Sequence, residues 1–331
     1  MKAAVLDAPG ELKVMEIPEP QPNEREVLIQ VNYCGLCGSD VKIYQGKWTI
    51  PLPRVLGHEF VGRVVSTGKE VDGFEPGDRV SVDPNETCGT CEYCRTDRPN
   101  FCTKMIDHGI LVDGGFAELA IAGQHAVYKL PATVSLEEGS FLELLSCCVH
   151  CINRSEIKVG QAVAVFGGGP AGQVLHQLAT SAGAGTVHLF THSKEKLDLA
   201  RKLGVTEALN PDEVDLGDFQ FDVVIDAVGS SQVIQDGLKT LTKNGRLMVF
   251  GQVPEGQMAE IDLFSLLFNE TSIIPTFINP YTMDQAFRIL EKKQIDVQAL
   301  ISHVVALEDI QRGFDIVLNK EPGAMKVLIR P

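Results

Sequence analysis

The sequence has no long apolar run and no excess of positive charge, and each absence excludes a class of protein. No stretch approaches the ~18 apolar residues that span a bilayer, and the opening run ends at Asp7 before a signal-peptide core develops. We therefore expect a cytoplasmic protein with no membrane partner. Lys and Arg number 29 against 44 Asp and Glu, and the net charge of −15 would repel phosphates. No nucleic-acid partner is expected.

What is present fits a globular protein of about two domains. The 331 residues are 44% hydrophobic and 22% charged. Up to about residue 141, short Val and Ile runs broken by Gly and Pro predict an antiparallel β domain. From about 146, short apolar runs alternate with amphipathic stretches, which predicts a doubly wound parallel sheet.

We expect individual elements of the parallel-sheet region as follows. Strands are predicted over 162–166, 186–190, 221–226, 246–250 and 271–277, and helices over 171–182, 194–203 and 232–241. After residue 279 a helix is predicted over 281–293 and a strand over 325–329. This last segment is expected to rejoin the first domain.

A glycine-rich turn follows the first of these strands. The pattern G-x-G-x-x-G between a strand and a helix is typical of dinucleotide sites, where the first glycine permits a tight turn and the second lets the backbone approach a pyrophosphate. The third glycine allows close packing of helix on strand, and the helix amides face the anion. The predicted cofactor contacts here are Gly167, Gly169, Pro170, Ala171 and Gly172.

The end of the second predicted strand bears on the choice between NAD and NADP. An acid commonly stands about 20 residues past the glycines and accepts the ribose hydroxyls of NAD. Thr191 occupies that place here, followed by His192, Ser193 and Lys194. These side chains can donate hydrogen bonds or positive charge to a 2′-phosphate, so NADP(H) is modestly favoured over NAD(H); the alternative is that Thr191 tolerates NAD while Lys194 is solvated.

Four cysteines in one short polar loop predict a structural zinc site. Their spacing is C-x2-C-x2-C-x7-C, and four thiolates around tetrahedral zinc form a closed site. A nucleic-acid zinc ribbon is the functional alternative, against which the acidic composition argues. The predicted ligands are Cys88, Cys91, Cys94 and Cys102.

A dispersed set of S, N and O donors is the candidate for a second, catalytic zinc, which needs few protein ligands and one open position. It comprises Cys37, His58, Glu59 and Glu143. Taken alone, His58 could be a core histidine, and Cys34 with Cys37 a redox pair. The remaining cysteines, at 147, 148 and 151, have helical spacing among apolar residues and are expected to be buried packing.

The segment from Gly57 to Gly62, Gly-His-Glu-Phe-Val-Gly, resembles the zinc signature of the medium-chain alcohol dehydrogenases, and the likeness covers essentially the whole chain. Glu59 together with Glu143 resembles the polyol branch that includes sorbitol dehydrogenase. The resemblance implies a GroES-like β catalytic domain, 1–146 and 280–331, and a Rossmann cofactor domain, 147–279, with the active site in the cleft between them. It also implies that Cys37, His58 and Glu59 or Glu143 hold the metal, and that Ser39 is the proton-relay hydroxyl.

Within that family, zinc acts as a Lewis acid for hydride transfer between a nicotinamide and a secondary alcohol or polyol. The resemblance implies two zincs per chain, an alcohol or polyol substrate, and a homodimer or homotetramer joined through the Rossmann sheet edges, with 271–277 as the edge strand. The chain departs from the family at Leu144, Lys42 and Thr191, where proline, histidine and an acid are frequent. A simple alcohol or aldehyde reductase, and a zinc-binding member without turnover, are the alternatives.

Overall fold

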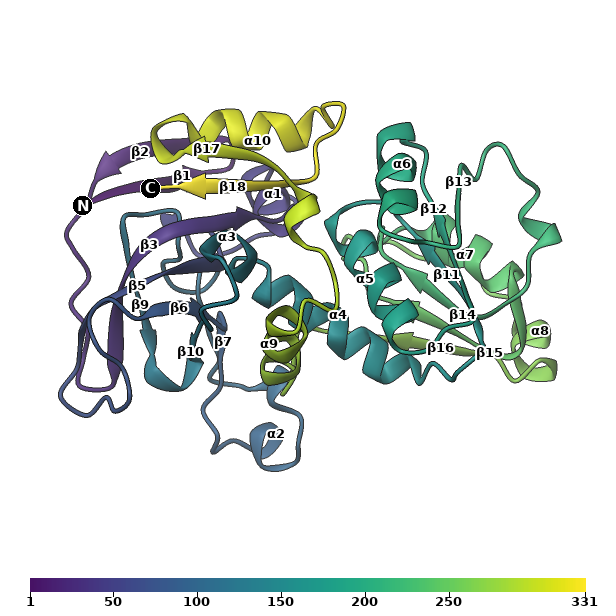
Figure 1. Cartoon of the computed structure of the whole chain (residues 1–331), viewed down its shortest axis with the longest axis horizontal. Coiled ribbons are helices and arrows are strands. Elements are labelled where there is room, and N and C mark those ends of the chain that lie inside the picture. Colours follow the sequence, from purple (N-terminus) through teal and green to yellow (C-terminus); the bar gives the residue numbers. More distant parts are fainter. The chain divides into compact units, whose positions relative to one another are not determined.

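The computed structural model describes residues 1–331, and they form two compact units. The first unit comprises Met1–Leu144, Met283–Lys293 and Val297–Pro331, and the second comprises Leu145–Thr282 and Gln294–Asp296. Helix α4 (Leu142–Ser155) begins in the first unit and continues in the second. Figure 1 shows the returning C-terminal segments, in yellow, beside the purple N-terminal strands.

The second unit is built on a six-stranded parallel sheet with the order β13-β12-β11-β14-β15-β16. This is the 3-2-1-4-5-6 order of a dinucleotide-binding sheet, which reverses between β11 and β14. The three central strands β12, β11 and β14 consist mostly of buried apolar residues, as expected for a parallel sheet covered on both faces. The strands are β11 (Ala162–Phe166), β12 (Thr186–Phe190), β13 (Glu207–Leu209), β14 (Phe221–Asp226), β15 (Leu241–Val249) and β16 (Ser272–Pro275). The helices are α5 (Pro170–Ser181), α6 (Lys194–Lys202), α7 (Ser231–Lys239) and α8 (Leu263–Phe268).

The first unit is a β structure around a largely antiparallel seven-stranded sheet. Its order is β10-β6-β5-β3-β18-β17, with β9 also paired to β3, and a smaller sheet has the order β2-β1-β4. The strands are β1 (Lys2–Ala8), β2 (Glu11–Glu16), β3 (Glu26–Leu36), β4 (Arg54–Val55), β5 (Glu59–Thr67), β6 (Arg79–Val82), β7 (Asn85–Glu86), β8 (Ile106–Asp107), β9 (Leu119–Gly123), β10 (Val127–Lys129), β17 (Ile301–Ala306) and β18 (Lys326–Arg330). The helices are α1 (Gly38–Tyr44), α2 (Glu92–Arg95), α3 (Leu136–Gly139), α9 (Met283–Glu291) and α10 (Ile310–Leu318).

Several predicted elements are confirmed. The strands over 162–166, 186–190 and 221–226 coincide with β11, β12 and β14, and the C-terminal strand does rejoin the first unit, because β18 pairs with β3. The strand predicted from 246 in fact begins at Leu241, and the strand predicted over 271–277 is the shorter β16. Strand β16 is an edge strand, as expected. None of the helices combines the length and the apolar composition that a transmembrane span requires.

Candidate active site and zinc-binding residues

The glycine-rich turn lies between β11 and α5, at the point where the strand order reverses. Gly167 has φ +114°, a backbone conformation that favours glycine. A Cβ at Gly172 would lie 1.8 Å from the carbonyl oxygen of Gly167, so the third glycine is needed for close packing. Around Gly169, the N-cap of α5, a Cβ would meet nothing within 4 Å. The open space at Gly169 and the acid-free first turn of α5 suit a pyrophosphate.

Three of the four residues after β12 already have polar side-chain partners. The side chain of Thr191 lies against Gly168, where a Cβ would be 2.7 Å from its methyl carbon. His192 Nδ1 is 3.0 Å from Asp212, Ser193 Oγ donates to Glu195 at 2.8 Å, and Lys194 Nζ donates to Asp198 at 2.6 Å. Asp212 and Glu195 are exposed, and Asp198 is half-buried.

The four cysteines of the predicted structural site converge, with all four sulfurs within 4.8 Å of one another. Sγ of Cys91 lies 3.5 Å from that of Cys94 and 4.0 Å from that of Cys102. Hydrogen bonds from the Thr90 hydroxyl and nearby amides lower the pKa of Cys88 to about 5. A thiolate is the form that binds zinc, so the donor set fits the metal.

Cys37 and His58 come together at the start of α1. The Asp40 side chain accepts the amide of Cys37 at 2.9 Å and forms a capping interaction that fixes the start of this helix. His58 Nδ1 lies 3.5 Å from the buried Asp40 carboxylate, and His58 Nε2 lies 3.4 Å from Ser39 Oγ. A carboxylate at Nδ1 holds the imidazole so that Nε2 is left for a metal. Burial alone would lower the pKa of His58, but Asp40 and Cys37 outweigh it and raise that pKa.

Glu59 completes this cluster: one ligand atom each from Cys37, His58 and Glu59 lie within 4.8 Å of one another. Glu59 is 1% exposed and begins β5. Its carboxylate can lie against β3 only because position 35 is glycine, where a Cβ would be 1.9 Å from Oε2. The mixed S, N and O set fits a zinc with an open position. The carboxylate of Glu143 is not part of this group.

Lys326 is the functional neighbour that sequence reasoning missed. Its Nζ lies 2.7 Å and 2.5 Å from the two carboxylate oxygens of Glu59 and 5.6 Å from the ring centre of Phe141. Burial acts to lower the pKa of Lys326, and the charges of Glu59 and Cys37 act more strongly to raise it. Lys326 therefore neutralises a carboxylate that the fold has removed from water.

Of the other cysteines, Cys34, Cys148 and Cys151 are buried, whereas Cys147 is only half-buried, so the burial predicted for it is not found. None of the nine cysteines forms a disulfide. Cys34 is fully buried, and burial raises its pKa well above the usual value, which argues against a redox pair with Cys37. On α4, Cys148 and Cys151 are buried, and burial raises the pKa of Cys151 to about 12.

Comparisons with known proteins agree with this geometry. Residues 23–132 match the alcohol dehydrogenase GroES-like domain, and residues 170–292 match the zinc-binding dehydrogenase model. A sorbitol dehydrogenase from Bacillus subtilis (strain 168) is 31% identical over 344 residues, covering 100% of this chain and 97% of its own. The chain belongs to the zinc-dependent medium-chain alcohol dehydrogenase family. It is an oxidoreductase, and membership of this family supports zinc and a nicotinamide as its cofactors.

Two further family members bear on substrate and cofactor. An L-threonine 3-dehydrogenase from Klebsiella pneumoniae (strain 342) is 32% identical over 337 residues, with 98% of each chain covered. A solved structure from Sinorhizobium meliloti 1021, described as a zinc-binding dehydrogenase bound to NADP, is 33% identical with a TM-score of 0.95. It covers 100% of this chain and 99% of its own. The family resemblance and the fold class predicted from the sequence are thus confirmed.

Proposed function

We propose that the protein catalyses reversible hydride transfer between a nicotinamide cofactor and a secondary alcohol or polyol, using a zinc held by Cys37, His58 and Glu59. The observation that carries this proposal is the convergence of those three donors within 4.8 Å. The sorbitol dehydrogenase relative supports a polyol as the substrate class. Glu143 is the alternative carboxylate ligand.

The side chains around these donors have distinct tasks. Zinc, when bound, supplies Lewis acidity that lowers the pKa of an alcohol hydroxyl, and the nicotinamide exchanges the hydride. Asp40 orients His58, and Lys326 holds Glu59 in place. Ser39 Oγ is half-buried next to His58 Nε2 and is positioned to accept the hydroxyl proton and pass it towards solvent.

The test of this proposal is a substrate panel run with both cofactors on zinc-loaded protein. The panel contains sorbitol, butane-2,3-diol, butan-2-ol, L-threonine, the matching ketones and simple aldehydes, and reduced cofactor is followed by absorbance. Turnover of a secondary alcohol or polyol is expected. A simple aldehyde reductase would reduce aldehydes only, and a non-catalytic member would turn over nothing in the panel.

We further propose that each chain binds a second, structural zinc through Cys88, Cys91, Cys94 and Cys102. The lowered pKa of Cys88 and the amide donors around the sulfurs support it: the amide of Cys91 donates to Cys88 at 3.3 Å, and the amide of Lys104 to Cys102 at 3.4 Å. Such N–H donors stabilise the thiolates that zinc requires.

A modest preference for NADP(H) is also proposed. The lack of an acid at Thr191 and the NADP-bound relative support it. To bind the 2′-phosphate, Lys194 must give up its hydrogen bond to Asp198, and Ser193 must give up its hydrogen bond to Glu195. A charge-assisted hydrogen bond of ~1.5–3 kcal/mol corresponds to a preference for NADP(H) over NAD(H) of about ten- to a hundred-fold. The loss of the two existing hydrogen bonds reduces that preference.

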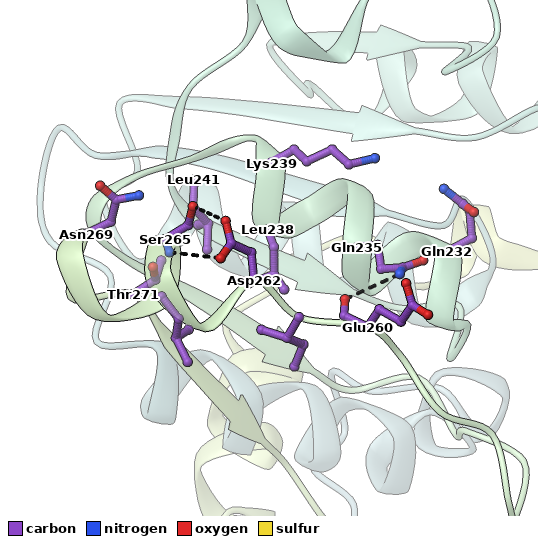
Figure 2. Close-up of a pocket in the computed structure, with 12 residues that line it drawn as sticks. Gln232, Gln235, Leu238, Lys239, Leu241, Glu260, Asp262, Ser265, Asn269 and Thr271 are labelled. Atoms are coloured by element: carbon purple, nitrogen blue, oxygen red, sulfur yellow. Dashed lines mark hydrogen bonds between the residues drawn. The ribbon is translucent and has the colours of Figure 1, made fainter.

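Finally, we propose that the protein forms a homodimer or homotetramer through the edge strand β16 and helix α8. Four apolar residues of α8 are 67–72% exposed: Leu263, Phe264, Leu267 and Phe268. Figure 2 shows how Asp262 caps this helix, next to a polar hollow of about 710 Å³ lined by α7 and α8. An unpaired strand edge beside an exposed apolar helix favours pairing with a second copy.

A further inference from the structure

Helix α5, which follows the glycine-rich turn, carries three buried polar side chains. Gln173 and His176 are 0% exposed, and Gln177 is 9% exposed. A buried polar group is costly unless it is hydrogen-bonded, so its partners show which segments it holds together. The side-chain amide of Gln173 is bonded to the segments expected to bind the cofactor, whereas that of Gln177 is bonded to the backbone of Asp296.

The side-chain amide of Gln173 joins two separate segments of the backbone. Its Nε2 donates to the carbonyl oxygen of Gly168 at 3.3 Å and to that of Lys196 at 3.0 Å. Its Oε1 lies 3.0 Å from Nε2 of His176. Carbonyl oxygens only accept hydrogen bonds, so a reversed amide would place its own oxygen against both of them. The orientation of Gln173 is therefore fixed, and His176 Nε2 donates to Oε1.

The two joined segments are those proposed to bind the two phosphate groups of the cofactor. Gly168 lies in the glycine-rich turn, and the side chain of Thr191 packs against it. Lys196 lies in the first turn of α6, where its amide donates at 3.4 Å to Oγ of Ser193, the N-cap of this helix. Ser193 and Lys194 are the proposed donors to the 2′-phosphate. Gln173 thus connects the pyrophosphate turn to the turn that carries these donors.

We propose that Gln173 is a positioning residue for cofactor specificity, because it fixes the start of α6 relative to the glycine-rich turn. This inference rests on the proposed preference for NADP(H). The pyrophosphate and the 2′-phosphate belong to one molecule, so the two protein segments bind both groups well only when their spacing is already set. NAD(H) has no 2′-phosphate and depends less on the start of α6. Loss of the Gln173 amide should therefore weaken NADP(H) more than NAD(H).

The experiment measures the dissociation constants of NADPH and NADH separately, by nicotinamide fluorescence on zinc-loaded protein without substrate. Gln173→Met removes the bridging amide and keeps an unbranched side chain of similar length. Gln177→Met is the matched control. Gln177 is also a buried amide on α5, but its partners are the backbone of Asp296 and of Gln173 itself. The melting temperature of each variant measures its stability independently of the cofactor.

Both single variants should have a lower melting temperature than wild type, because each loses buried hydrogen bonds. Only Gln173→Met should change selectivity: NADPH should bind about five-fold or more weakly, and NADH within about two-fold of wild type. A second variant combines Gln173→Met with His176→Leu and so removes the histidine N–H that the single variant leaves without an acceptor. It should be at least as stable as Gln173→Met and show the same loss of selectivity.

An unchanged ratio of the two dissociation constants in both Gln173 variants overturns the inference and leaves the preference for NADP(H) intact. An equal weakening of NADPH and NADH by Gln173→Met also overturns it, because the side chain would then support nucleotide binding in general. The same change of ratio in Gln177→Met would assign the effect to a destabilised α5 and contradict the inference as well. If wild type binds NADPH no more tightly than NADH, the proposed preference itself fails, and the inference fails with it.

Discussion

Replacing Lys326 with methionine should destabilise the zinc-free protein severely, and zinc should reverse part of the loss. The side chains of Lys326 and Glu59 are 3% and 0% exposed, so the variant leaves the Glu59 carboxyl group buried and without its partner. Removing one member of a buried ion pair costs about 3–5 kcal/mol. At roughly 2–4 °C per kcal/mol, the melting temperature of the zinc-free protein should fall by about 10 °C.

The assay is differential scanning calorimetry of zinc-free and zinc-loaded protein. Lys326→Met should gain more from zinc than wild type does, because the cation restores a positive charge beside Glu59. The double variant Lys326→Met with Glu59→Gln is the control, because it removes both charges. When both proteins are zinc-free, the double variant should have a higher melting temperature than the single variant. A zinc-free Lys326→Met that melts within about 2 °C of wild type would refute the reasoning.

Three further predictions concern other parts of the chain. His176 is buried, its Nε2 lies 3.0 Å from Gln173, and its Nδ1 has no partner. Burial lowers the pKa of His176 from 6.5 to about 4. The stability that the neutral side chain contributes is therefore complete above pH 6.5, and about 3 kcal/mol of it is lost as the pH falls to 4. The melting temperature should therefore fall more steeply over this range in wild type than in His176→Gln, and parallel curves would contradict the assignment. Thr191→Asp should shift the ratio of kcat/KM towards NAD by about ten-fold or more through repulsion of the 2′-phosphate; an unchanged ratio would show that the phosphate does not lie there. Leu267→Asp on the exposed face of α8 should lower the mass measured by light scattering, and Lys239→Asp on α7 is the control that should not; an unchanged oligomer would exclude α8 from the interface.

The sequence predicted best those parts in which a local pattern decides the structure. The strands over 162–166, 186–190 and 221–226 are short apolar runs that only a doubly covered sheet can bury. The glycine-rich turn was predictable for the same reason, because its conformational demands fall within six residues. By contrast, β17 and α10 were not predicted.

What the sequence could not provide is the pairing of distant residues. Lys326 and Glu59 are 267 positions apart and meet only because β18 is inserted next to β3 in the register that joins Val327 to Leu36. A lysine in such a segment is by composition an ordinary polar residue, and only its burial beside Glu59 distinguishes it.

Zinc content and activity of Cys37→Ser test the central claim most directly. Wild type should contain two zincs per chain by atomic emission, and the variant should contain about one and have no measurable turnover, because the catalytic metal has only three protein ligands. Cys91→Ser is the matched control. It should also lose one zinc, but the main consequence should be a lower stability of the protein, since a structural metal contributes its binding energy to folding. A Cys37→Ser variant that keeps both zincs, or that still oxidises a secondary alcohol, would contradict the assignment of the catalytic site.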